Sequence, residues 1–496
     1  MLEARGVVGG AAVTEEFHPG FRNSTASYTV SLLNPKIISD MRLHEHGLKI
    51  VLRRNDNFLP TLEGDYLLAG RGGLTRREIA RHSAADAENY DAYAAALKSV
   101  VGILRQWLLR SPPNVGGGLA DLLALLTLAG HVRGLALDEQ RHLVDFFTKS
   151  AADILTRYFR HDLVQALFGF DAIVGNYASP HTPGSAYVLL HHLFGETNGV
   201  EGAWGHAIGG MGAITQAMAK AAREKGVDIR LNAPVDEVIV EQGRAVGAVA
   251  GGAAYRAKAV VAGINPRLLF TLLPAGAVAP EVERRMAHWQ CESATFRMNV
   301  ALSELPRFAA LPGPGDHLTA GIIIAPSLAY MDRAYLTARS DGFSKEPVVE
   351  MLIPSTLDDS LAPAGAHVAS LFCQHFPYEI AGGWDVRREE AADAVIAHVD
   401  RYAPGFAASV VGRSALSPLD LERRFGLTGG DIFHGKMGLD QIFSNRPMLG
   451  HADYRMPVPG LYLCGAGAHP GGGVTGAPGH NAAQAVLRDR KKFGLL

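Results

Sequence analysis

The sequence predicts an α/β fold in which a Rossmann-like, dinucleotide-binding domain is interleaved with an α+β second domain. Three observations carry this prediction. The last forty residues hold a strand, a glycine-rich loop and a helix start, the first ten hold an acidic residue and a glycine pair, and long helical and β-rich blocks lie between them. With 496 residues the chain is long enough for two domains and a large core.

The N-terminal segment supplies a carboxylate at a strand end, Glu3, followed by Arg5 and by Gly9-Gly10. A dinucleotide fold uses such a carboxylate to hold a ribose hydroxyl, and a glycine pair lets the chain pass close to a pyrophosphate. The usual unit opens with a strand, G-x-G-x-x-G and a helix before that acid, whereas only Met1 and Leu2 precede Glu3. We therefore expect an incomplete fold without its first strand and glycine motif, and in-frame upstream DNA encoding roughly 30 to 40 further residues that contain them.

From Leu74 to about Phe170 the pattern is helical. Apolar residues at helical spacing predict a helix from Ala84 to Leu109. Ser150-Ala-Ala-Asp153 resembles a capping box that opens another helix. A helical block inserted into a nucleotide-binding fold is a natural cap over a substrate.

The longest apolar stretch, Leu119–Gly130, is interrupted by Asp121. It is shorter than the roughly 18 residues that a membrane span needs. A buried or interfacial helix is expected here, and peripheral contact with a membrane is the less favoured alternative.

The chain then returns to the dinucleotide fold. The pattern predicts a helix, a strand, a hairpin turning at Gln242-Gly243, and a buried strand, over Gly209–Lys225, Val227–Leu231, Val235–Ala250 and Ala257–Ala262. A second excursion, from about residue 281 to 440, is expected to form a mixed sheet at the floor of a substrate cavity. Its predicted strands and helix are Phe296–Leu302, Gly321–Ile324, Pro347–Ile353, His367–Cys373 and Val386–Tyr402.

At the C-terminal end, the apolar run Leu461–Leu463 indicates a buried strand. Seven glycines follow between Gly465 and Gly479, before a helix with small residues on its first turns. A strand, a glycine loop and a helix N-terminus bring bare backbone N–H groups against an anionic or polar ligand. We expect residues 1–60, 200–280 and 441–496 to form the dinucleotide-binding domain, and residues 61–199 and 281–440 to form the substrate or cap domain.

Several motifs together resemble the FAD-dependent phytoene desaturase and amine oxidase superfamily over essentially the whole chain. They are Leu2-Glu-Ala-Arg5, Gly9–Glu16, Pro19-Gly-Phe21, Ser179–Ser185, Trp204-Gly205, Gly209–Gly212, Gly429–His434 and Cys464–Asn481. The resemblance implies FAD as cofactor, with the backbone of Val235 at the adenine. The implied FAD-binding residues are Glu3, Arg5, Gly9, Gly10, Val235, Gly465, Ala466, Gly472, Gly473 and Val474.

The resemblance also implies an oxidoreductase of the desaturase or oxidase type, which passes hydride from a C–H bond of a small apolar substrate to the flavin. No second G-x-G-x-x-G is followed by an acidic residue, which argues against NAD(P)H as the electron donor; oxygen or a quinone is expected to take the electrons from the flavin. His469, inside the glycine loop, is the candidate catalytic residue: either a proton or electrostatic partner of the flavin, or a histidine that binds backbone. Two alternatives stay open, a flavoprotein-like scaffold acting through protein partners and a redox-neutral flavin isomerase.

Composition excludes other classes. Lys plus Arg is 47 and Asp plus Glu is 49, a net charge of −2, so nothing favours nucleic acid as a partner. The three cysteines form no C-x-x-C pair, which argues against a local redox dithiol, and no metal site is expected because no His-x-x-x-His pair has an acidic third ligand. No export or transit signal is visible; we expect a cytoplasmic protein if the source is bacterial and a protein of the mitochondrial matrix if it is eukaryotic.

Overall fold

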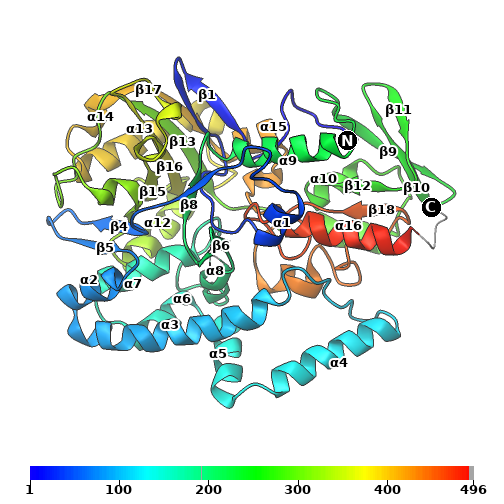
Figure 1. Ribbon diagram of the computed structural model, residues 1–496, viewed down its shortest axis with the longest axis horizontal. Coiled ribbons are helices and arrows are strands. Elements are labelled where there is room, and N and C mark those ends of the chain that lie inside the picture. Colours follow the sequence, from blue (N-terminus) through cyan, green and yellow to red (C-terminus); the bar gives the residue numbers. More distant parts are fainter. Residues whose placement is uncertain (192, 491–496) are drawn as a thin grey trace.

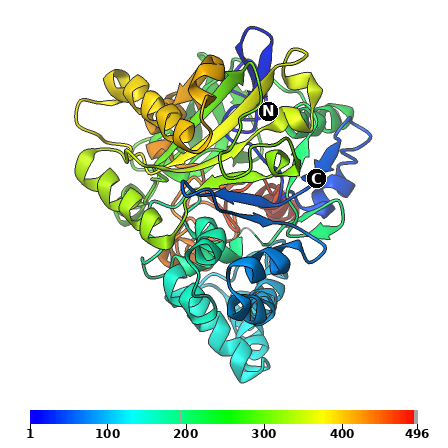
Figure 2. The same ribbon diagram turned by 90° about the vertical axis from the view of Figure 1, so that its left-hand side faces the viewer.

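The computed structural model describes residues 1–191 and 193–490. Figure 1 shows a large twisted sheet with its helices at one end of the molecule and a smaller group of strands beside α16 (Ala477–Asp489) at the other. A block of helices lies beneath, and Figure 2 shows it tapering away from the sheet. The predicted α/β class is confirmed. The last six residues of the predicted segment 441–496 lie outside the described range.

The large sheet has seven strands in the order β17-β13-β16-β15-β14-β4-β5. Neighbours are antiparallel except β14 and β4, which are parallel, so the sheet is mixed as predicted. All four strands predicted after residue 281 form. The strands are β4 (Asn57–Pro60), β5 (Tyr66–Ala69), β13 (Thr295–Leu302), β14 (Gly321–Ile324), β15 (Val348–Leu352), β16 (His367–Gln374) and β17 (Val410–Leu416).

The two faces of this sheet differ, because side chains alternate along each strand. On one face Phe296, Met298 and Val300 of β13 share a hydrophobic cluster with α13. On the other face the same strand carries Arg297 and Asn299, both buried. The helices of this part of the chain are α12 (Leu328–Asp341), α13 (Trp384–Tyr402), α14 (Phe406–Ser409) and α15 (Pro418–Phe425).

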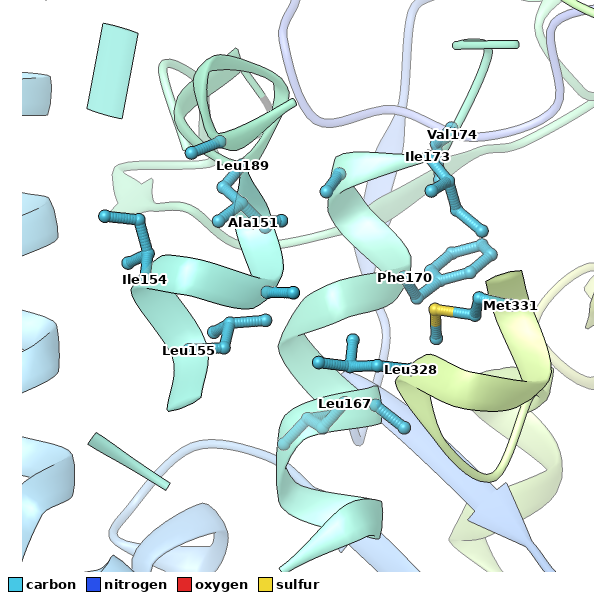
Figure 3. Close-up of a cluster of buried hydrophobic side chains, with 14 of the residues drawn as sticks. Ala151, Ile154, Leu155, Leu167, Phe170, Ile173, Val174, Leu189, Leu328 and Met331 are labelled. Atoms are coloured by element: carbon cyan, nitrogen blue, oxygen red, sulfur yellow. The ribbon is translucent and has the colours of Figure 1, made fainter. Parts of the chain in front are cut away.

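The helical block contacts the sheet directly at β4 and β5, and it also packs against α12. Figure 3 shows Leu167 and Phe170 beside Leu328 and Met331 of α12. Leu155 and Leu189 lie on the other side of the helix that carries Leu167, in the same cluster. The predicted capping box at the start of α6 is present. The block comprises α2 (Leu74–His82), α3 (Ala84–Arg105), α4 (Leu119–Arg133), α5 (Leu137–Thr148), α6 (Ala151–Tyr158), α7 (Asp162–Gly169) and α8 (Ala186–His191).

Helix α4 projects from the body of the molecule (Figure 1). It forms where the apolar stretch predicts a helix, but none of its residues is buried; Leu119, Leu122, Leu123 and Leu126 are each more than half exposed, the most open of them 73 %. A buried setting is therefore wrong for this helix. Its apolar residues are distributed around the helix axis, so α4 has no single apolar face that would pack against the core. No single described helix has the length and apolarity to cross a membrane; α4 and α5, at 116° to each other, pass that test only as a bent pair.

The segments predicted to bind a dinucleotide contain two parallel pairings. Strand β12 (Val260–Ala262) pairs with β18 (Leu461–Leu463), and Leu2 forms a parallel bridge with Arg230. The predicted strand Val227–Leu231 is wrong in extent, since this segment pairs with residues 1–5 through only a few backbone bonds, such as that from the Glu3 N–H to the Arg230 carbonyl (2.9 Å). These residues therefore do not form the continuous ladder of backbone hydrogen bonds that defines a strand.

The remaining elements surround these pairings. Helix α9 starts three residues later than predicted, because Gly209 and Gly210 hold the left-handed φ values of +85° and +80°. The predicted hairpin forms, with Gln242 and Gly243 at its turn. These elements are β1 (Thr14–His18), β2 (Phe21–Ser24), α1 (Pro35–Asp40), β3 (Ile50–Leu52), β6 (Glu196–Thr197), β7 (Val200–Glu201), β8 (Gly205–Ala207), α9 (Gly212–Glu224), β9 (Val235–Glu241), β10 (Arg244–Ala250), β11 (Ala253–Arg256), α10 (Pro266–Thr271) and α11 (Pro280–Ala287).

Candidate functional site

The N-terminal glycine loop, residues 3–12, is held to the hairpin and to α9. The Glu3 carbonyl accepts a hydrogen bond from the Ala233 N–H (2.8 Å), two residues before Val235, so the structure brings Glu3 and the start of β9 together. The Glu3 carboxylate accepts the Arg5 N–H (3.0 Å) and remains partly exposed. A carboxylate in this place is able to accept a further hydroxyl donor.

Arg5 fixes the shape of this loop. Its guanidinium forms an ion pair with Glu15 (2.5 Å) and lies over the Phe425 ring. It also reaches the Gly10 carbonyl at 3.5 Å. Gly10 has φ +55° and open space where a Cβ would stand, while a Cβ on Gly9 would lie 2.6 Å from the Thr215 hydroxyl. Gly9 therefore allows close packing on α9, and Gly10 leaves bare backbone open to a ligand.

The C-terminal glycine loop, residues 465–476, joins β18 to α16. A Cβ on Gly465 would lie 2.9 Å from the Gly263 backbone, and one on Gly472 would lie 2.6 Å from the Phe433 ring. Gly473 has φ +101°, and its Cβ would lie 2.5 Å from Leu32. Gly473 therefore requires glycine for conformation and for space, whereas Gly465 and Gly472 require it for space.

Residues 12–34 connect the N-terminal glycine loop to the C-terminal one. Val474 packs in the same hydrophobic cluster as Ala12 and Leu33. The Asn34 N–H donates to the Thr475 carbonyl (3.1 Å). The structure thus gathers the predicted residues into an N-terminal group around Glu3, Gly9 and Val235 and a C-terminal group around Gly465 and Gly473, connected by residues 12–34.

A buried arginine, Arg446, holds the C-terminal glycine loop. Its guanidinium donates to the carbonyls of Ala466 (2.7 Å), Phe433 (2.7 Å) and Gln441 (3.0 Å). Burial lowers the pKa of Arg446 to about 10, so it stays charged at neutral pH. Sequence reasoning missed this residue, because nothing local distinguishes it from a surface arginine.

His469 is turned toward the helical block. Its Nε2 lies 3.0 Å from the Trp107 carbonyl, and burial lowers its pKa to about 4. The neutral ring therefore donates Nε2–H to that carbonyl. Nearby, the Asn481 amide of α16 donates to the Leu108 carbonyl (2.9 Å), and the Asn114 side chain accepts the Ala452 N–H (2.9 Å). The C-terminal glycine loop and the end of α3 are thus joined by side-chain hydrogen bonds.

A buried polar cluster lies on the face of the large sheet that carries Arg297, opposite the face covered by α13. Tyr28 donates a short hydrogen bond to Glu350, and Arg297 lies over the Tyr28 ring (4.4 Å). Arg53 approaches Glu350 at 3.9 Å. Burial raises the pKa of Tyr28 well above its usual range and lowers the pKa of Arg297. Sequence analysis did not identify this cluster, because its members are far apart in the chain.

Two cavities adjoin these groups. The loop cavity, of about 180 Å³, is lined by Leu32, His191, Pro470, Thr475 and Ala477. The aromatic chamber, of about 410 Å³, has walls formed by Tyr90, Tyr93, Leu97, Leu189, Leu193 and Trp204. Arg105 and Glu201 line both cavities and form an ion pair (2.6 Å) between them.

Asp171 lines the aromatic chamber. Burial, and in second place the charge of Glu350, raises the pKa of Asp171 to about 7. Its sequence context carried a signal that was overlooked: a lone acid in the apolar run from Ala166 to Val174. Asp56 lines the same chamber, and burial raises its pKa as well.

Comparison with known proteins places these features in context. The family model of flavin-containing amine oxidoreductases matches residues 1–294. Pyridine nucleotide-disulfide oxidoreductase domain-containing protein 2 of Rattus norvegicus is 40 % identical over 99 % of this chain and 90 % of its own length. The lycopene-forming phytoene desaturase of Pseudescherichia vulneris is 26 % identical over 68 % of this chain and 66 % of its own. An engineered putrescine oxidase has the same fold, with a TM-score of 0.59 at 16 % identity over 99 % of this chain and 93 % of that one.

Proposed function

Because the chain belongs to the family of flavin-containing amine oxidoreductases and is an FAD-dependent oxidoreductase, we propose that it dehydrogenates an apolar substrate, in the manner of a desaturase or oxidase. The observation that carries the proposal is the aromatic chamber, whose apolar walls lie next to the loop cavity. Cavities of this size, walled by apolar side chains with a few polar groups, are typical of small-molecule sites.

The residues present fit FAD. Gly10 leaves open space beside bare backbone, which a cofactor group could approach closely. Glu3 would hold a ribose hydroxyl and Val235 would meet the adenine, while residues 465–474 would contact the flavin end. When bound, FAD supplies a two-electron acceptor for a substrate C–H bond.

The chain's own groups position and shield the substrate. Trp204, Leu189 and Leu193 exclude water from the chamber. Neutral His469 stays in its hydrogen bond to Trp107, so in this proposal it orients the glycine loop. In this proposal oxygen or a quinone takes the electrons from the reduced flavin.

The exposed leucines of α4 are compatible with contact with a membrane surface or a protein partner.

The test is anaerobic mixing of the purified yellow protein with a panel of alkenes, terpenoids and polyenes. Loss of the visible flavin absorbance with an apolar substrate, and its return on adding oxygen or a soluble quinone, is the expected result. Reduction by small polar amines alone would contradict the proposal. Reduction by NADPH in place of any of these would contradict the assignment of an apolar substrate as the electron donor.

A further inference from the structure

The aromatic chamber contains a carboxyl group, that of Asp171, among its largely apolar walls. We propose that the Asp171 carboxyl anchors a hydrogen-bond-donating head group, an amine or a hydroxyl, of an elongated apolar substrate, and that the reacting bond lies at a distance from that head group, toward residues 470–477. This inference rests on the proposed function and adds the class of its substrate.

The first argument is the setting of Asp171. It sits in a single turn, Phe170–Ala172, that follows α7. Its neighbours Phe170 and Ile173 pack into the cluster of Figure 3, whereas Asp171 lines the chamber. No residue in the described part of the chain donates a hydrogen bond to its carboxyl. A carboxyl among apolar walls is costly unless a donor satisfies it, and a ligand in the chamber would supply that donor.

The second argument is the charge around Asp171. Asp56 lines the same chamber, and Glu350 lies close enough to raise the pKa of Asp171. Two cationic side chains line the chamber. Arg105 is paired with Glu201 and donates to three carbonyls, and Lys98 is exposed at the rim.

The other groups facing this region do not reverse that balance. Arg53 is shared between Glu350 and the Thr29 hydroxyl, and Arg71 donates to the Arg53 carbonyl. Tyr90 and Tyr93 are neutral phenols whose pKa values burial raises further. The interior therefore favours a donor or a cation and disfavours a carboxylate head group.

The third argument is length. The chamber and the loop cavity share Arg105 and Glu201, so a molecule that fills both passes beside this ion pair. Its head would lie at Asp171 and its other end near Pro470 and Thr475. The anchor is then a separate group from the carbon that loses hydrogen, unlike the oxidation of an amine at the carbon that bears its nitrogen.

Binding of three ten-carbon probes to the purified holoenzyme tests the anchor by calorimetry: decylamine, decanol and decanoate. We expect decanoate to bind at least about tenfold more weakly than the better of the other two. Binding of the amine alone identifies a cationic head group, and binding of both identifies any donor. Equal binding of decanoate would overturn the proposal.

Variants locate the site. Asp171→Asn should weaken the amine about tenfold, whereas Asp162→Asn, the same exchange at an exposed position of α7, should leave binding unchanged. Ala94→Phe, which places a ring in the chamber, should weaken all probes whatever their head group. If Asp171→Asn binds the amine and the alcohol as the parent does, Asp171 is not the anchor.

The position of the reacting bond is read from products. With an unsaturated or long-chain amine that reduces the flavin, we expect a product with a new carbon–carbon double bond and the nitrogen retained, two hydrogens having passed to the flavin. Release of ammonia and an aldehyde would overturn the remote-bond inference. Absence of flavin reduction with every compound would contradict the proposed function, while the binding differences among probes would still decide the anchor.

Discussion

At the scale of single residues, Asp171 has a consequence for stability. Its pKa is about 7 in the folded chain against 3.8 ordinarily, so between those values the folded state holds a proton that the unfolded chain has released. The contribution to stability is therefore complete below about pH 4 and is lost as pH rises through 7. Because the Asp171 side chain is partly exposed, we expect a loss of about 2 kcal/mol, less than the full shift implies at about 1.36 kcal/mol per unit of pKa.

Asp171→Asn should remove this loss. The variant should match the parent near pH 4.5 and exceed its free energy of unfolding by about 2 kcal/mol at pH 8, as measured by urea denaturation across that range. Asp162→Asn is the control. A variant that loses stability at pH 8 would show that Asp171 is ionised and well paired in the folded chain.

The residues that sequence reasoning identified are those with a local signature. Glu3, Gly9 and Gly473 stand in motifs, and the motif context alone pointed to them. Arg446 and Glu350 could not be found in this way, because their roles depend on carbonyls and side chains that lie more than ten residues away, or hundreds of residues away, along the chain. The role of Glu3, Gly9 and Gly473 in cofactor binding stays a prediction.

At the scale of elements, the C-terminal glycine loop gives a paired prediction. Gly473→Val forces a branched residue to φ +101° and against Leu32, at a cost of about 1–3 kcal/mol in backbone strain. We expect this variant to purify with less flavin. The measurement is the flavin content per polypeptide and the melting temperature.

Cys464→Ser is the matched change at the start of the same loop. Burial raises the pKa of the Cys464 thiol to about 11, so no thiolate is available for redox chemistry at neutral pH. Anaerobic flavin reduction should be unchanged in this variant. Loss of reduction in Cys464→Ser, with normal flavin content in Gly473→Val, would favour a thiol mechanism over the loop's role in cofactor binding.

The secondary-structure elements that could be predicted from the sequence are those whose pairing partners are close in the chain. The hairpin of β9 and β10 was predictable because its turn and both strands are contiguous, with Gln242 and Gly243 at positive φ. Residues 227–231 were not, since a parallel strand depends on a distant segment for its ladder. The exposure of α4 was equally out of reach, because apolar composition alone does not distinguish a core helix from a projecting one.

At the scale of the whole molecule, α4 should be separable from the folded core. Replacing Leu119, Leu122, Leu123 and Leu126 by Gln removes side chains that are more than half exposed, so the free energy of unfolding should change by no more than about 0.5 kcal/mol per site. Self-association and binding of a hydrophobic dye should fall. Leu155→Gln, at a fully buried position, is the contrasting variant and should cost more than about 3 kcal/mol.

Light scattering and thermal denaturation on the two variants decide this point. If the α4 replacement unfolds the protein as Leu155→Gln does, then α4 is part of the folded core in solution. Unchanged scattering would show that the leucines of α4 do not drive association of this chain.

The hydrogen bonds that join His469 to Trp107, Asn481 to Leu108 and Ala452 to Asn114 also link cofactor occupancy to the cap. Segments fastened together in this way open together or not at all, and a ligand that binds the closed form lowers the frequency of opening for both. Loading with FAD should therefore slow amide hydrogen exchange in residues 104–114, which no predicted FAD contact touches. The end of α3 would then report, from the substrate side, whether the enzyme carries its cofactor.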